Sequence, residues 1–179
     1  MSNTSPTNAV ERAREAVGRG DWQQAHELLV EADTSRQLSG PDLALHAEVA
    51  YAAGHLDATI GAWERAYAQS LRARDPLAAA GAAIRVAMHL LFDTAMMAPV
   101  RGWLSRAEQL LEGQGESPVH AWRAVVRSYE RLLSGDFQSA LHWARQAIDV
   151  GTKCNPAAAA VGTSPRHAVS SWRVTSRRA

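Results

Sequence analysis

The chain of 179 residues contains a single cysteine, Cys154, and few aromatic residues, which make up 6% of it. One cysteine cannot form an internal disulfide. The seven histidines include no HxxxH spacing, and Cys154 has no CxxC partner, so we expect no metal site. The phosphate-binding spacings GxxxxGK[ST] and GxGxxG are also absent. We therefore expect no cofactor.

Net charge is nearly absent as well, at +1 with histidine neutral. This balance favours neither a nucleic-acid binder nor an enzyme for acidic substrates. The distribution is uneven, because residues 163–179 contain four arginines and no acidic residue. The first residues lack a basic stretch followed by an apolar one, and no run approaches 18 apolar residues. We expect a cytoplasmic protein that does not contact a membrane.

Alanine is abundant, at about one residue in five, and hydrophobic residues make up 46% of the chain. This composition suits closely packed helices rather than a sheet. Residues 117–156 show the pattern most fully. A serine and a proline suit the start of a helix, an apolar stripe of helical spacing follows, and Ser134-Gly135-Asp136 separates it from a second stripe. Two helices joined by so short a turn must lie antiparallel.

The same pattern recurs along the chain. Five prolines preceded by cap or turn residues fall at intervals of 35, 35, 42 and 38, and these are Pro6, Pro41, Pro76, Pro118 and Pro156. An alanine follows the first residue of each internal turn by twelve positions, as Ala32, Ala66, Ala107 and Ala147. Such spacing is typical of an array of two-helix units. We expect units at about 6–39, 40–74, 75–116 and 117–154, within a repeat domain of residues 6–151.

Two turns and the helices after them resemble the tetratricopeptide repeat. They are Gly135-Asp136-Phe137, followed by Ala140 and Ala147, and Gly20-Asp21-Trp22, followed by Ala25, Leu29 and Ala32. The resemblance covers roughly residues 7–151 and weakens where Ala95-Met96 replaces Gly-Asp. It implies an all-α fold, a tetratricopeptide-like α-solenoid of about four antiparallel helix pairs. Their stacking would form a right-handed superhelix with the first helices on its concave face.

Residues 61–92 and 101–113 further resemble the repeat arrays of large bacterial LuxR-type transcriptional regulators. In that family the array precedes a C-terminal helix-turn-helix DNA-binding domain, and no such domain is present in this sequence. The resemblance therefore implies a truncated member, a fragment of the repeat region. Its expected function is that of a non-catalytic scaffold for protein–protein interaction or regulation.

The repeat pattern fails after Pro156. Residues 157–161 begin a fifth first helix, but residues 162–179 lack a helical stripe and are rich in serine, threonine and arginine. We expect residues 155–179 to be an aborted fifth repeat and a disordered basic tail, and residues 1–5 to be disordered. A truncated or frame-shifted chain would explain this, and a natural flexible tail is the alternative. Removal of residues 152–179 should leave helix content per residue equal or higher, and the uncapped last helix predicts self-association.

Aromatic and arginine side chains on first helices are the candidate binding residues, because such side chains anchor protein interfaces. They are Tyr51, Arg85, Arg123, Arg127 and Tyr129. A protein or peptide partner with acidic and apolar side chains would suit this groove. Packing or solvent exposure is the alternative interpretation of each residue.

The remaining aromatic and histidine residues are expected to be structural. Trp22, Trp63, Trp103 and Trp143 fall on turns or second helices, so we expect them to pack between units. Most of the histidines are expected at the surface or along the groove.

The sequence also bears on two other classes of function, an enzyme and a DNA-binding regulator. An enzyme is not expected, because the sequence offers no nucleophile–base pair, paired carboxylates or metal set, and hence no catalytic residue. The alternative is a DNA-binding transcriptional regulator that acts through a partner or through the basic tail. The tail contains no recognisable nucleic-acid-reading module, so we expect no specific nucleic-acid binding by this chain.

Overall fold

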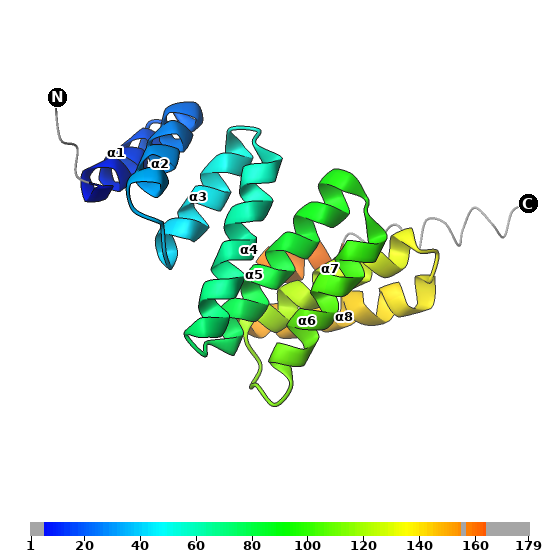
Figure 1. The fold of residues 1–179 in the computed structure, drawn as a ribbon. Helices are drawn as coiled ribbons and strands as arrows, with labels where there is room; N and C mark the ends of the chain where they lie inside the picture. Colours follow the sequence, from blue (N-terminus) through cyan, green and yellow to red (C-terminus); the bar gives the residue numbers. More distant parts are fainter. Residues whose placement is uncertain (1–5, 155–156, 164–179) are drawn as a thin grey trace, which may run out of the picture. The chain divides into compact units, whose positions relative to one another are not determined.

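The computed structural model describes residues 6–154 and 157–163, which are helical apart from short turns (Figure 1). No strand occurs in these ranges, and the all-α class predicted from the sequence is confirmed. The chain divides into two compact units, unit 1 (Met1–Asp75) and unit 2 (Pro76–Ala179). Each unit contains two helical hairpins.

Unit 1 is built from helices α1 to α4. α1 (Pro6–Gly18) pairs with α2 (Trp22–Ser35), and α3 (Pro41–Ala52) pairs with α4 (Leu56–Arg72). The two hairpins are joined because α2 also packs against α3. Small side chains let these helices approach closely. The side chains with no exposed surface include Ala13, Ala25, Leu29, Leu43 and Ala47.

Unit 2 repeats this arrangement with one irregularity. α5 (Pro76–His89) continues into the π-helix η1 (Leu90–Thr94) and pairs with α6 (Met97–Leu111). α7 (Pro118–Leu133) pairs with α8 (Phe137–Cys154) and also contacts α5 and α6. The buried Ser128 hydroxyl of α7 donates a hydrogen bond of 3.0 Å to the carbonyl oxygen of Ala140 on α8. This bond fixes how the two helices of the last hairpin lie along each other.

Local sequence signals explain where the helices begin. The first helix of each hairpin starts at a proline, whose missing N–H costs nothing at this position. The residue that opens the turn inside each hairpin has a positive φ, and these residues are Gly20, Gly54, Ala95 and Gly135. Glycine adopts this conformation freely, whereas Ala95 carries a Cβ atom. Ala95 lies in the hairpin in which the α-helix α5 changes to the π-helix η1.

The repeat-equivalent alanines are not all buried to the same degree. Ala32, Ala107 and Ala147 are at most 1% exposed, whereas Ala66 on α4 is only partly buried. Trp22 is 40% exposed, so the expectation that it packs in the core is wrong. It is the first residue of α2 and lies at the turn end of its hairpin. Of the other three tryptophans expected to pack between units, Trp63 is buried and Trp103 and Trp143 are partly buried.

The stretch formed by α5 and η1, Pro76–Thr94, is long and apolar enough to cross a bilayer by length and composition alone, with a mean hydropathy of 1.3. Arg85 and Asp93 interrupt its apolar residues, so it contains no unbroken apolar run of that length. Half of this stretch is buried, as in the core helix of a soluble domain. It is therefore weak evidence for a membrane span.

A short helix at residues 157–163 follows α8 and packs against it. Ala158 is completely buried in a cluster with residues of α7 and α8, and Val161 lies against the same cluster. The approach is close, because a Cβ atom at Gly151 would lie 2.6 Å from the backbone nitrogen of Ala159. Gly162 and Thr163, where disorder was expected to begin, are helical. Residues 1–5 and 164–179, also expected to be disordered, lie outside the described residues.

Candidate functional site

The predicted binding residues are divided between the two units. Tyr51 is 49% exposed near the end of α3 in unit 1. Arg85 is partly buried on α5, and the other three lie on α7, which packs against α5 in unit 2. Four of the five predicted binding residues therefore lie in unit 2.

Arg127 is only 8% exposed and lies in an ion-pair network. Its Nη2 atom is 2.7 Å from both carboxylate oxygens of Glu108 on α6, and its Nη1 atom is 3.5 Å from Glu130. Bidentate pairs of this kind are among the stronger charge-assisted hydrogen bonds in proteins. Arg127 therefore joins α6 to α7, and little of its guanidinium remains for a partner.

Glu130 is fully buried on α7 and forms ion pairs with Arg101, Arg127 and Arg131. The closest is Arg101 of α6, whose Nε atom lies 2.7 Å from Oε1. Burial alone would raise the pKa of Glu130, but the Arg101 hydrogen bond and the charges of Arg131 and Arg127 hold this pKa below its usual range. The buried carboxylate is thus compensated within unit 2, as a buried charge must be.

Arg123 differs from its neighbours because its pairing is incomplete. Its Nε atom is buried and has no hydrogen-bond partner in the described part of the chain. Its Nη2 atom lies 3.4 Å from the amide oxygen of Gln146 on α8, and its guanidinium lies 5.1 Å from the ring centroid of Trp143. Burial lowers the pKa of Arg123, and Arg127 adds to this effect while Glu108 opposes it. Arg123 thus presents a charge whose donors are only partly used.

Tyr129 contacts a different neighbour again. Its ring meets that of Phe92 in η1 edge to face, with centroids 5.0 Å apart, and Phe92 is 50% exposed. The three predicted residues of α7 therefore have different main contacts: Arg123 contacts α8, Arg127 contacts α6, and Tyr129 contacts η1 as well as the buried cluster between α7 and α8. The sequence correctly placed these three residues on one helix, but it did not show that their side chains contact different neighbours.

A cluster of three histidines in unit 1 was not identified from the sequence. His26 lies on α2, His46 on α3 and His55 in the turn before α4. The ring of His26 stacks on that of His55 at a centroid distance of 4.2 Å and lies 5.4 Å from that of His46. His26 and His46 are only 9% and 6% exposed, so they do not take the surface or groove position expected of most histidines.

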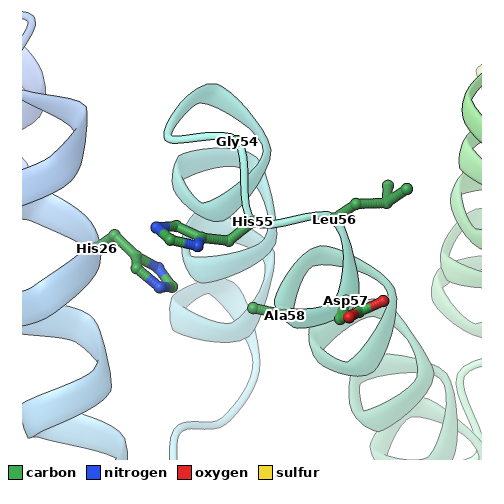
Figure 2. Close-up of a pocket in the computed structure, with 6 residues that line it drawn as sticks. All are labelled: His26, Gly54, His55, Leu56, Asp57 and Ala58. Atoms are coloured by element: carbon green, nitrogen blue, oxygen red, sulfur yellow. The ribbon is translucent and has the colours of Figure 1, made fainter.

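A depression of about 440 Å³ opens beside this cluster at the start of α4. It is lined by His26, Gly54, His55, Leu56, Asp57 and Ala58. Figure 2 shows the two imidazoles turned toward each other next to the methyl group of Ala58, whereas the side chain of Asp57 points away from them. The depression is thus bordered by two histidines and the first turn of a helix.

The buried imidazoles are incompletely hydrogen-bonded. The Nδ1 atom of His26 and both ring nitrogens of His46 have no partner among the described residues, whereas Nε2 of His55 lies 3.2 Å from Oε1 of Gln23. Burial, followed by the neighbouring histidine, lowers the pKa of both His26 and His46. Within the described residues, no group of three or more potential ligands is placed to hold a metal ion.

Comparisons with known proteins give no relative from which a function could be transferred: no protein-family model, no curated protein and no solved structure matches the chain.

Proposed function

We propose that the chain is a non-catalytic regulatory scaffold that binds an acidic segment of a partner protein. In this proposal its hairpins stack as a tetratricopeptide-like α-solenoid with a right-handed superhelix, and the protein works in the cytoplasm as part of a LuxR-type regulator. The regular placement of the helix-starting prolines and of the turn glycines supports the repeat assignment. The family assignment rests on the sequence resemblance alone.

The observation that carries the binding proposal is the incomplete pairing of Arg123. The nearby charges of Arg127 and Glu130 are matched inside unit 2, whereas the Nε atom of Arg123 is buried without an acceptor in the described structure. A buried donor without a partner costs free energy. Only part of the Arg123 side chain is buried, so its terminal amino groups can donate charge-assisted hydrogen bonds to a carboxylate of another protein.

Replacement of Arg123 by glutamate tests the proposal. The probe is a fluorescein-labelled peptide of six glutamates, and the readout is fluorescence anisotropy at low and moderate salt. The variant replaces the arginine donor with a negative charge, which repels the negatively charged peptide. We therefore expect the peptide to bind at least about tenfold more weakly, a loss of ~1.4 kcal/mol in binding free energy. A thermal melt of the same variant checks that it remains folded.

Arg145→Glu is the matched control, because Arg145 is exposed on α8 and the substitution changes the net charge equally. We expect this control to bind the peptide nearly as well as the original chain. Equal losses in the two variants would mean that the peptide senses only overall charge, and the proposal for Arg123 would be rejected.

A further inference from the structure

The contact between α2 and α3 joins the two helical hairpins of unit 1. His26 of α2 and His46 of α3 lie in this contact, with their ring centroids 5.4 Å apart. Both residues are at most 9% exposed. The ring of His55, in the turn before α4, stacks on that of His26 at a centroid distance of 4.2 Å (Figure 2). Three imidazoles therefore meet where one hairpin is held against the other.

The equivalent contact in unit 2, between α6 and α7, carries arginines at the two histidine positions. Arg101 lies six residues after the opening residue of its hairpin turn, as His26 does. Arg127 lies eight residues before the opening residue of its turn, as His46 does. The buried carboxylate of Glu130 pairs with both arginines, at 2.7 Å from Nε of Arg101 and 3.5 Å from Nη1 of Arg127. The charge at this place in unit 2 is therefore compensated, as a buried charge must be.

The contact between α2 and α3 has no such carboxylate at the equivalent position. Glu130 lies five residues before its turn opens, and the residue at that place in α3 is Val49, which is 1% exposed. Nδ1 of His26 and both ring nitrogens of His46 have no hydrogen-bond partner within the described chain. Neutral imidazoles can stay buried here at the cost of missing hydrogen bonds. Two imidazolium ions, in contrast, would lack the counter-charge that Glu130 provides in unit 2.

The charges around His26 do not replace this carboxylate. Burial, followed by the charge of His55, lowers the pKa of His26, and the exposed Glu27 opposes them. Nε2 of His55 lies 3.2 Å from Oε1 of Gln23, so this pair also crosses from the second hairpin to the first. His26 is therefore buried more easily in its neutral form.

The charges around His46 have the same net effect. Burial, followed by the charge of His26, lowers the pKa of His46, while Asp33 opposes this and Arg65 adds to it. The Asp33 carboxylate is already paired, because Nη1 and Nη2 of Arg65 lie 2.5 and 2.7 Å from its two oxygens. Neither histidine thus has a carboxylate of its own inside the contact.

We propose that protonation of His26 and His46 releases the hairpin α1–α2 from α3. Above about pH 6.5 an unperturbed imidazole is neutral, and the contact stays closed, with the ion pair of Arg14 on α1 and Asp42 on α3 crossing it at 2.7 Å. Below this pH the open form, in which the imidazoles reach water, binds protons that the closed form resists. The equilibrium therefore shifts toward the open form as the pH falls, and unit 1 contains a pH-sensitive joint.

Native-state hydrogen exchange of the full chain, resolved by residue with NMR spectroscopy, tests this release. A detached pair of helices this short has too little core to stay folded, so its amides exchange when the contact opens. Dividing the intrinsic exchange rate at each pH by the measured rate gives a protection factor, which reports the opening alone.

The expected change follows from the number of buried histidines. Between pH 7.5 and pH 5.5 one histidine with a strongly lowered pKa changes an opening equilibrium by at most about tenfold, and two change it by at most about 100-fold. We expect the protection factor of core amides in α2, such as that of Leu29, to fall at least about 20-fold. Amides of α7 and α8 should fall less than about tenfold, because His120 is the histidine with a lowered pKa among the described residues of unit 2.

Two sets of variants make the test decisive. His26→Leu combined with His46→Leu should reduce the fall in α2 to less than about threefold. His26→Gln combined with His46→Gln also removes both titrating groups, and it gives the same test if the leucine variant does not fold. His120→Leu is the matched control and should leave the fall in α2 unchanged. If α2 loses no more protection than α7 and α8, or keeps its full loss without the two histidines, the proposal is overturned.

Discussion

Ala95 has a φ of 54° at a position where the equivalent turns carry glycine. The left-handed conformation costs an L-residue with a Cβ atom roughly 1 kcal/mol more than it costs glycine. We therefore expect Ala95→Gly to raise the free energy of unfolding by about 1 kcal/mol. A urea titration followed by circular dichroism measures this change.

Ala73→Gly is the control for that substitution. Ala73 is exposed after α4 and has an ordinary right-handed φ of −76°, so glycine relieves nothing there. It should leave stability unchanged or reduce it by a few tenths of a kcal/mol. Ala95→Gly would contradict our interpretation if it destabilised the protein as much as this control does.

The candidate sites show what residue-level reasoning from the sequence can and cannot provide. The sequence identified Arg123, Arg127 and Tyr129 from their types and their place on one helix. It could not show that Glu108 pairs with Arg127, because that contact joins residues on two different helices. The histidine cluster was not predicted for the same reason, since its members lie on three separate segments and match no motif. A useful signal was present, because His55 stands where Asp21 and Asp136 stand in two other turns.

The starts of the helices, by contrast, were largely predictable at the scale of elements. A proline after a cap residue and a small residue at a turn act within a few positions, so the sequence displays them directly. The widening of α5 into η1 and the partial exposure of Ala66 depend on what packs around them. Neighbour-dependent features of this kind cannot be read from a local pattern.

The sequence predicted no loss of helix content per residue when the C-terminal residues are removed. The short helix at residues 157–163 instead predicts a loss of stability. Deleting residues 155–179 removes Ala158 and Val161 from their contacts with α7 and α8. Loss of this burial should lower the free energy of unfolding by about 1–3 kcal/mol. Urea titrations of the truncated and full chains measure the difference.

A second truncation, after Thr163, keeps this helix and removes only the residues that follow it. We expect its stability to equal that of the full chain. If both truncated proteins unfold at the same urea concentration as the full chain, the helix at 157–163 does not contribute to the core of unit 2.

At the scale of the whole molecule, buried histidines should make stability depend on pH. The pKa values of His26, His46 and His120 are all lowered in the folded state, chiefly by burial. Below about pH 6.5 the unfolded chain therefore binds protons that the folded chain resists. The free energy of unfolding should fall as the pH decreases from 6.5 toward 5.5, and urea titrations at several pH values measure the slope.

His46→Leu tests the origin of that slope, because it removes one of the buried groups. We expect the variant to show a weaker dependence on pH over the same range, whatever its stability at pH 7.5. An unchanged slope would assign the acid sensitivity to other groups.

The pairing of sequence-adjacent helices in every hairpin also bears on how the chain folds. The main contacts in unit 1 join α1 to α2, α2 to α3 and α3 to α4, so each helix packs on the one that directly precedes it. Such a topology has low contact order, and domains of this kind fold on timescales on the order of microseconds to milliseconds. A ribosome adds roughly 5–20 residues per second. Unit 1 can therefore complete its packing co-translationally, before the helices of unit 2 have been synthesised.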